Sequence, residues 1–376
     1  MSIKLFACGD VLSTQEDKNF ISDNLKDVIK NSDIAICNFE ASLKTINMEA
    51  IPKAGPHLYQ HKNLVKYLKD VGFDLVSLAN NHIYDYGQKA LENTICELEE
   101  YNIDFVGAGV NFKDTYHTKI IEKNGIKIGI LAGCENEFGC LYEKQDRGGY
   151  AWLFHYLIED NIRKLKNDVD VVILLAHAGV ENISFPIKEW RDRYKRLCDV
   201  GVDVVIGHHP HVPQGYEKYG NSTIFYSLGN FYFDTVSFQN KKDDSYSVEL
   251  EFEKSGLKNF NIIYHQKVNG QICKVDKVEV DFSFEELNAL LNNNFEKRND
   301  DICIELFNKY YYSYYETALR IMPKNISMMQ VLKFIIKRVF FKDKSINNRN
   351  LLLLHNIKID SHRFVVQRAL SLISEK

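Results

Sequence analysis

The sequence predicts an α/β fold in which a mixed sheet, arranged as two sheets face to face, has helices on the outside. Short apolar runs alternate with segments of helical periodicity through the first two thirds of the 376-residue chain. Several runs, such as 169–175 and 202–206, are apolar on both faces, which is typical of strands covered on each side. The Asn-Gly pair at 124–125 lies between two such runs and predicts a hairpin, because both residues readily adopt a positive φ angle.

The pattern assigns each element in turn. Strands are expected at 3–8, 33–38, 74–78, 104–106, 119–122, 127–132, 169–175, 202–206 and 223–227. Helices are expected at 17–30, 61–71, 88–101, 155–166 and 187–200. The composition changes after Asp234: 246–253 and 259–268 alternate like strands, 273–281 is expected to add another, and the pattern becomes helical from Ser283. We therefore predict a first domain at 1–240, a β extension at 241–282 that completes its core, and a helical region at 283–376.

Composition limits the classes of function. A formal net charge of −4 argues against a general coat for polyanions, so no nucleic acid is expected as a partner. None of the eight cysteines forms a Cys-x-x-Cys pair, which favours a reducing compartment. The N-terminus shows no secretory leader, and no apolar run is long enough to cross a bilayer. The expected location is cytoplasmic, with peripheral attachment to the inner membrane face left open.

Two segments of the C-terminal region have an unusual composition. Residues 310–315 contain five tyrosines, which we interpret as an aromatic face that packs the helical region onto the main domain. Residues 331–344 mix phenylalanine and isoleucine with lysine and arginine, as a basic amphipathic helix does. Such a helix can lie on an anionic membrane, contact a partner in a biosynthetic complex, or dock on its own core.

The strongest single signal is a histidine cluster directly after the expected strand 202–206. Residues 207–211 read Gly-His-His-Pro-His. Neutral imidazole is the commonest protein ligand for metals. On an extended backbone, alternate residues point to the same side, so His209 and His211 are expected to face one site. A polar loop that merely contains histidines is the alternative.

Polar residues also end several other expected strands. Asp10 ends the first, Asn38-Phe39-Glu40 ends the second, Asn80-Asn81-His82 ends the third and His177 ends a later one. In open α/β sheets, ligands bind beyond the carboxyl ends of the strands, so these side chains are expected to converge. Each residue alone also fits a structural role, such as a helix cap, a turn former or a satisfied core histidine.

These residue types fit a site for two divalent metal ions. Mixed oxygen and nitrogen ligands suit manganese, zinc or iron better than a sulfur-rich structural site does. Two such ions lower the pKa of a water between them and so provide a nucleophile at neutral pH. Asp85 follows His82 at a spacing that lets it hold the second imidazole nitrogen. His57 and Lys53 lie in a plausible substrate loop at 52–57, where surface and helix-start roles fit His57 equally well.

The order of these motifs resembles the CapA family of bacterial capsule and poly-γ-glutamate synthesis proteins. The resemblance covers roughly residues 3–235 and includes Gly9-Asp10, Leu78-Ala79-Asn80-Asn81-His82, His177-x-Gly179-x-Glu181 and the run from Tyr226 to Phe231. It implies a four-layer α/β/β/α sandwich of the metallophosphoesterase type. It also implies metal ligands at Asp10, Glu40, Asn81, His177, His209 and His211, an acid at His82, and site-lining residues at His208, Glu181 and Asn230.

The resemblance also has departures. Family members usually carry tryptophan where this chain has Ala178, and many begin with a membrane anchor. The first motif lacks the Asp-x-His of ordinary metallophosphoesterases, which points to one weaker metal position. The expected function is hydrolysis of a phosphoester or an amide in surface-polymer biosynthesis, with His82 protonating the leaving group and an anionic polymer or phosphoester as substrate. The alternative is a non-catalytic, metal-containing assembly or polymer-carrier protein.

Overall fold

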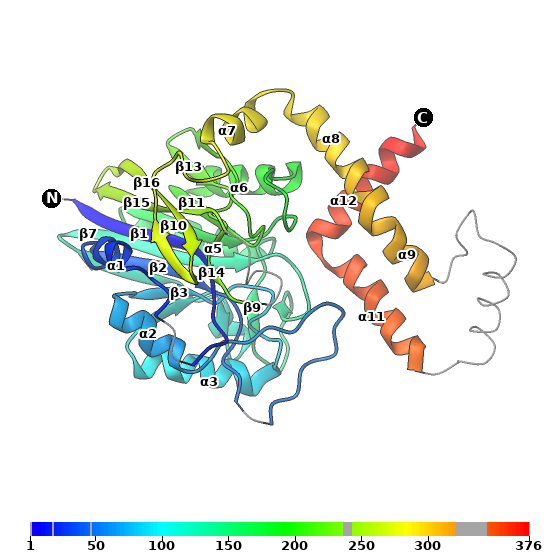
Figure 1. Ribbon diagram of the computed structural model, residues 1–376, viewed down its shortest axis with the longest axis horizontal. Coiled ribbons are helices and arrows are strands. Elements are labelled where there is room, and N and C mark those ends of the chain that lie inside the picture. The colour runs from blue at the N-terminus through cyan, green and yellow to red at the C-terminus, as the bar shows by residue number, and fades with distance from the viewer. Residues whose placement is uncertain (1, 17–18, 46, 236–242, 320–343, 376) are drawn as a thin grey trace, which may run out of the picture. The chain divides into compact units, whose positions relative to one another are not determined.

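The computed structural model describes residues 2–16, 19–45, 47–235, 243–319 and 344–375 (Figure 1). These residues form two compact units. The first contains residues 1–51 and 57–295, and the second contains 52–56 and 296–376. All but one of the predicted site residues belong to the first unit.

The first sheet of the larger unit is mixed and has the order β17-β16-β15-β1-β2-β3-β4, with β14 paired to the end of β1. Its strands β1 to β4 run parallel, whereas β15 to β17 are antiparallel to their neighbours. The bounds are β1 (Ile3–Leu12), β2 (Ile34–Phe39), β3 (Leu75–Ser77), β4 (Asp104–Val106), β14 (Asn230–Phe233), β15 (Ser245–Glu253), β16 (Gly256–Val268) and β17 (Gln271–Lys274).

The second sheet has the order β12-β13-β11-β10-β7-β6. Its bounds are β6 (Lys119–Lys123), β7 (Ile126–Cys134), β10 (Val171–His177), β11 (Val204–His208), β12 (Tyr216–Tyr219) and β13 (Ser222–Phe225). Asn124 and Gly125 join β6 to β7 with φ angles of 53° and 72°, so the predicted hairpin is confirmed. A small third sheet consists of β5 (Ala108–Gly109), β8 (Cys140–Leu141) and β9 (Gly149–Ala151).

Helices cover the outer faces of the two sheets. On the first sheet α1 contacts β17 and α3 contacts β4, whereas α5 and α6 contact β7, β10 and β11 of the second. One apolar core contains residues of both sheets, such as Ile36 and Ile173, and β1 contacts β11 across it. The predicted four-layer α/β/β/α sandwich is therefore confirmed (Figure 1). The bounds are α1 (Asp23–Lys30), α2 (Asn63–Val71), α3 (Gly87–Glu100), α4 (Phe112–Thr115), α5 (Tyr156–Asp168), α6 (Lys188–Val200) and α7 (Phe284–Asn292).

Local sequence explains where the helices begin and end. In α2 the apolar residues Leu64, Leu68 and Val71 share one buried face, and the helix ends at Gly72, which is left-handed with φ 113°. The helix predicted at 17–30 begins only at Asp23, because Ile21 forms a bridge with Ile272 and the Ser22 N–H donates to Ile272 O; residues 17 and 18 lie outside the described residues. The further strand expected at 273–281 is present as β17 but is shorter and begins earlier, since it ends at Lys274 and a turn follows.

The second unit is helical. It contains α8 (Phe295–Leu306), the π-helix η1 (Phe307–Tyr311), α9 (Tyr312–Leu319), α11 (Lys344–Lys358) and α12 (Asp360–Ser374). Within the tyrosine run, Tyr311 is buried against His362, whereas Tyr310, Tyr312 and Tyr314 are exposed. The basic amphipathic helix predicted at 331–344 lies outside the described residues except for its last residue. Among the helices that the structure describes, none combines the length and apolarity needed to span a bilayer.

Gly9 allows β14 to approach β1 closely. A Cβ at position 9 would collide with the backbone carbonyl of Gly229, and a backbone atom cannot move aside as a flexible side chain can. Gly9→Ala should therefore separate the strands that carry Asp10 and Asn230. We expect a loss of about 1–3 kcal/mol in the free energy of unfolding, measured by urea denaturation. Lys4→Ala, an exposed change on the same strand, should alter it by less than about 0.5 kcal/mol. Equal stability of Gly9→Ala and wild type would contradict the close packing.

Candidate metal centre

Asp10 is fixed where three strands meet. In the register of the sheet it lies opposite Asn38 of β2 and Asn230 of β14. Asn38 Nδ2 donates to Asp10 Oδ1 at 2.8 Å, and the backbone N–H of His209 donates to Oδ2 at 3.3 Å. Burial alone would raise the pKa of Asp10, but a hydrogen bond from His211 holds it well below its ordinary value. Asp10 is therefore a fully buried carboxylate that stays ionised.

Glu40 follows directly after β2 and is also fully buried. Its backbone N–H donates to Val11 O, and Asn38 Nδ2 lies 3.4 Å from its Oε2. Its Oε1 has no hydrogen-bond partner among the residues that the structure describes. Burial and the neighbouring charge of Asp10 raise the pKa of Glu40 well above its ordinary value. A second buried carboxylate with an unsatisfied oxygen is costly unless a cation accompanies it.

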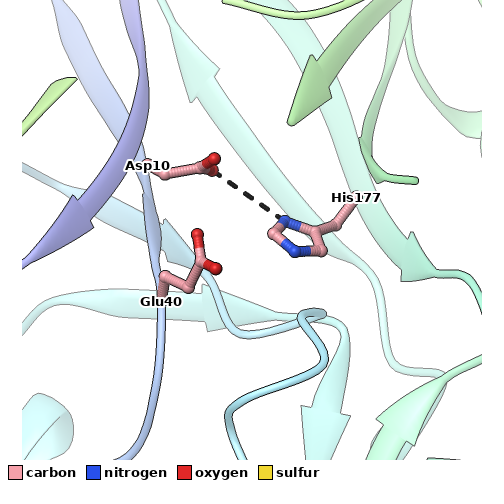
Figure 2. Close-up of side chains that lie close together, drawn as sticks. All are labelled: Asp10, Glu40 and His177. Carbon is pink, nitrogen blue, oxygen red and sulfur yellow. Dashed lines mark ion pairs between the residues drawn. The ribbon is translucent and has the colours of Figure 1, made fainter. Parts of the chain in front are cut away.

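His177 ends β10 and completes a cluster with these two carboxylates. One ligand atom from each of Asp10, Glu40 and His177 lies within 4.8 Å of the others, and Figure 2 shows the three side chains turned toward one another. The His177 Nδ1 lies 3.9 Å from Asp10 Oδ1, and its Nε2 lies 3.1 Å from Asn81 Oδ1. Burial lowers the pKa of His177 well below its ordinary value, so the ring is neutral and retains a lone pair for a cation.

The histidines after β11 reach the cluster, but not for the reason that the sequence suggested. The strand ends at His208, and His209 and His211 have φ angles of 95° and 60°, so alternation along an extended strand is a wrong explanation. A turn with left-handed residues instead places both imidazoles next to the cluster. His209 Nδ1 lies 3.1 Å from His177 Nε2, and His211 Nδ1 lies 3.5 Å from Asp10 Oδ2.

These two imidazoles differ in charge. Burial lowers the pKa of His209 to about 4, so the ring is neutral near pH 7. Burial would lower the pKa of His211 as well, but the carboxylates of Glu40 and Asp10 raise it to about 10. His211 Nε2 lies 3.8 Å from Glu40 Oε1, and its Nδ1 lies 2.9 Å from Asn230 Oδ1. His211 must therefore release a proton when it becomes a metal ligand.

The turn after β3 contributes Asn80, Asn81, His82 and Asp85. Asn80 Nδ2 donates to Phe39 O at 2.9 Å and so fixes the chain beside Glu40. Asp85 Oδ2 lies 2.7 Å from His82 Nδ1, which is the contact that the sequence spacing predicted. The same oxygen accepts a hydrogen bond from the backbone N–H of Leu58 at 2.7 Å. His82 is therefore held at one nitrogen beside the cluster, and its charge contributes to the lowered pKa of His209.

The other predicted site residues lie at varied positions. The Nε2 of His208 lies 3.3 Å from Cys8 O, so this buried ring faces the first sheet. Glu181 is exposed, and its charge helps to raise the pKa values of Glu40 and His211. His57 is half-buried and its Nε2 lies 2.7 Å from Ile51 O rather than in the cluster. Lys53 belongs to residues 52–56 of the second unit, and its role in substrate binding stays a prediction.

Sequence analysis placed Asn38 among the polar residues expected to converge without giving it a role, and it missed Glu135. Asn38 contacts Asp10, Glu40 and His177 through one amide group. Glu135 follows β7, is fully buried, accepts a hydrogen bond from the Gly179 N–H at 3.1 Å, and lies 3.4 Å from His209 Nε2. With Nε2 facing Glu135, the Nδ1 of His209 is the nitrogen nearer to His177. Glu135 therefore orients a predicted ligand.

Replacing Glu135 tests this orientation. Glu135→Gln keeps an acceptor for Gly179 but loses the negative charge opposite His209. We expect about 10–100-fold weaker binding of Mn²⁺, measured by titration calorimetry, and a changed visible spectrum of the Co²⁺-loaded protein. An unchanged affinity and spectrum would show that Glu135 only anchors the Gly179 loop.

The donor set fits a divalent cation. It combines buried carboxylate, amide and imidazole groups without sulfur, and it includes the Oε1 of Glu40, which has no hydrogen-bond partner among the described residues and lies 3.8 Å from His211 Nε2. Such ligands suit manganese, zinc or iron. The described residues contain a three-residue cluster, and Asn81, His209 and His211 adjoin it.

Comparison with known proteins finds a matching family model and similar bacterial proteins. The family model described as "Bacterial capsule synthesis protein PGA_cap" matches residues 4–235. A capsule biosynthesis protein CapA of Bacillus anthracis is 32% identical over 253 residues, which cover 65% of this chain and 61% of that protein. A PGA biosynthesis protein CapA of Bacillus subtilis is 30% identical over 252 residues, covering 67% of this chain and 66% of that one. The chain thus spans less than two thirds of the length of these relatives.

Solved structures were compared as well. A 5'-nucleotidase precursor from Thermus thermophilus superposes with a TM-score of 0.46 at 13% identity, covering 78% of this chain and 58% of that one. A phosphatase from Mycoplasma pneumoniae gives a TM-score of 0.44 at 15% identity, covering 76% and 99%.

Proposed function

The chain belongs to the PGA_cap family of bacterial capsule synthesis proteins, and from this premise we propose that it is a metal-dependent hydrolase of surface-polymer biosynthesis. The proposed substrate is a phosphoester or an amide of a capsule, poly-γ-glutamate or related polymer. The observation that carries the proposal is the buried meeting of Asp10, Glu40 and His177 beside the His82–Asp85 pair. The metal ligands alone would suit a purely structural metal site equally well, so the proposal depends on His82 as a neighbouring acid.

We propose that two divalent cations bind, each of manganese, zinc or iron. Asp10, Glu40 and His177 would hold one, and His209, His211 and Asn81 would complete the positions around the other. Bound there, the cations would supply Lewis acidity and a water of lowered pKa. Two features of the chain prepare for them: the lowered pKa values of His177 and His209 keep both rings neutral, and Asn38 fixes Asp10 by a hydrogen bond.

The chain itself would supply the acid. Asp85 Oδ2 lies 2.7 Å from His82 Nδ1 and so orients the imidazole. His82 can then donate the proton at Nε2 to the leaving oxygen or nitrogen of the substrate. The two buried carboxylates would repel an anionic substrate group unless bound cations offset their charge. Substrate binding should therefore depend on metal.

The experiment measures metal and turnover on one preparation. The purified protein is loaded with Mn²⁺, Zn²⁺ or Fe²⁺, its metal content is determined by mass spectrometry, and hydrolysis of a phosphodiester and of a γ-linked oligoglutamate is followed. Metal-dependent release of product from either substrate supports the proposal. Bound metal without turnover on both would favour the assembly or carrier protein instead.

A further inference from the structure

Lys44, four residues after Glu40, has two aromatic neighbours. The Nζ of Lys44 lies 4.8 Å from the ring centroid of Tyr59, 4.5 Å from that of Tyr86, and 3.4 Å from the Tyr86 hydroxyl. All three side chains are half-buried. In the part of the chain that the structure describes, no carboxylate forms an ion pair with Lys44. We call Lys44, Tyr59 and Tyr86 the lysine clamp.

The backbone of the lysine clamp is built onto that of Glu40. Leu43 forms a β-bridge with Gln60, Lys44 N donates to Gln60 O at 3.3 Å, and Gln60 N donates to Ser42 O at 2.9 Å. The buried side chain of Gln60 then donates to Glu40 O at 3.1 Å. Lys44 therefore occupies a fixed position four residues from a predicted metal ligand.

The lysine clamp is also joined to the proposed acid. Tyr86 directly follows Asp85, and the Leu58 N–H, next to Tyr59, donates to the Asp85 oxygen that contacts His82. The backbone N–H of Ile51 donates to Asp85 O at 2.9 Å. The segments that carry both tyrosines are therefore attached to the residue that orients His82.

We propose that Lys44 binds a second anionic group of the substrate, a carboxylate or a phosphate, next to the group that is hydrolysed. The inference rests on the proposed function and names the substrate class: a molecule with repeated negative charges rather than a single one. The tyrosine faces favour a cation between them and restrict its rotamers, but they do not neutralise it. The positive charge thus remains available for a charge-assisted hydrogen bond at a partly desolvated position.

Binding measurements separate the two anionic groups. Titration calorimetry on the Mn²⁺-loaded protein would use inorganic phosphate, tripolyphosphate and a penta-γ-glutamate peptide. The variants are Lys44→Met, Lys44→Arg and the control Lys254→Met, which removes an exposed lysine from the β15–β16 turn. We expect Lys44→Met to weaken binding of tripolyphosphate or pentaglutamate about tenfold, the effect of one charge-assisted hydrogen bond. Lys44→Arg should restore most of that loss.

Each outcome decides the matter. A loss confined to pentaglutamate identifies a carboxylate as the second group, and a loss confined to tripolyphosphate identifies a phosphate. Three results would overturn the inference: Lys44→Met weakens the binding of inorganic phosphate as much as that of the multivalent anions, Lys254→Met loses as much affinity as Lys44→Met, or Lys44→Met loses no affinity. If the wild type binds the multivalent anions through Lys44 but hydrolyses none of the substrates, the hydrolase proposal fails and the binding site stands.

Discussion

Glu40→Gln is expected to abolish most of the stabilisation by metal while leaving the metal-free protein at least as stable as the wild type. A ligand at 100 times its Kd stabilises a protein by about 2.7 kcal/mol, or roughly 5–10 °C in Tm for a domain of this size. Loss of a residue that only supports a metal ligand weakens metal binding by about 10–100-fold. Loss of the Glu40 carboxylate, a predicted ligand, should therefore reduce the metal affinity by at least about 100-fold. At the same Mn²⁺ concentration the stabilisation then falls to about 0.4 kcal/mol.

The stability of the metal-free variant follows from the pKa of Glu40. Burial and Asp10 raise that pKa in the folded state above the ordinary value of 4.5. At pH values below the ordinary one, Glu40 is protonated in both the folded and the unfolded state and has no penalty. As the pH rises, Glu40 ionises first in the unfolded chain. On folding, Glu40 must then take up a proton or be buried as a second negative charge beside Asp10, and either one lowers the free energy of unfolding. Glutamine has no such penalty, and Asp10 remains as a partner of His211, so the advantage of Glu40→Gln should grow with pH.

Thermal unfolding in EDTA and in excess Mn²⁺, repeated between about pH 5 and 8, tests both statements. Glu99→Gln, which removes an exposed carboxylate on α3, should respond to metal as the wild type does. An undiminished gain in Tm for Glu40→Gln in Mn²⁺ would contradict the assignment of Glu40. A metal-free variant that is much less stable than wild type would show that its carboxylate is structural.

The layers of the fold and the edge on which the site lies could be predicted from the sequence because both depend on local patterns. Runs that are apolar on both faces indicated covered strands, and polar residues at their carboxyl ends indicated the edge where Asp10, Glu40 and His177 meet. The same rule would have found Glu135. The strand prediction stopped at 132, two residues before β7 ends at Cys134, so Glu135 was not recognised as the residue after a strand.

The remaining features depend on contacts between distant segments. The pairing of β14 with β1, which brings Asn230 to Asp10, joins residues that are 220 positions apart in the chain and has no local signature. The left-handed residues His209 and His211 are likewise not glycines, and non-glycine residues are uncommon at positive φ, so the sequence does not announce this turn. The lysine clamp depends on a bridge between Leu43 and Gln60, which no periodicity predicts.

His82→Gln is expected to reduce turnover of a substrate with a poor leaving group by about 10²–10⁴-fold while leaving bound metal unchanged. The glutamine amide can still contact Asp85, so the turn after β3 should keep its structure, but it has no proton to transfer. A leaving group that is stable as an anion needs no such proton. We therefore expect less than about a tenfold loss on a nitrophenyl phosphodiester and the full loss on an alkyl phosphodiester or a γ-glutamyl amide.

The ratio of the two losses is the decisive measurement, because it removes any general effect of misfolding. Asp85→Asn should show the same pattern at a smaller magnitude, since it weakens the support of His82 without removing the imidazole. Equal losses on nitrophenyl and alkyl substrates would contradict an acid role and point to substrate positioning instead. A fall in bound metal in parallel with activity would place His82 among the ligands, where its Nδ1 contact with Asp85 would leave Nε2 as the nitrogen that binds.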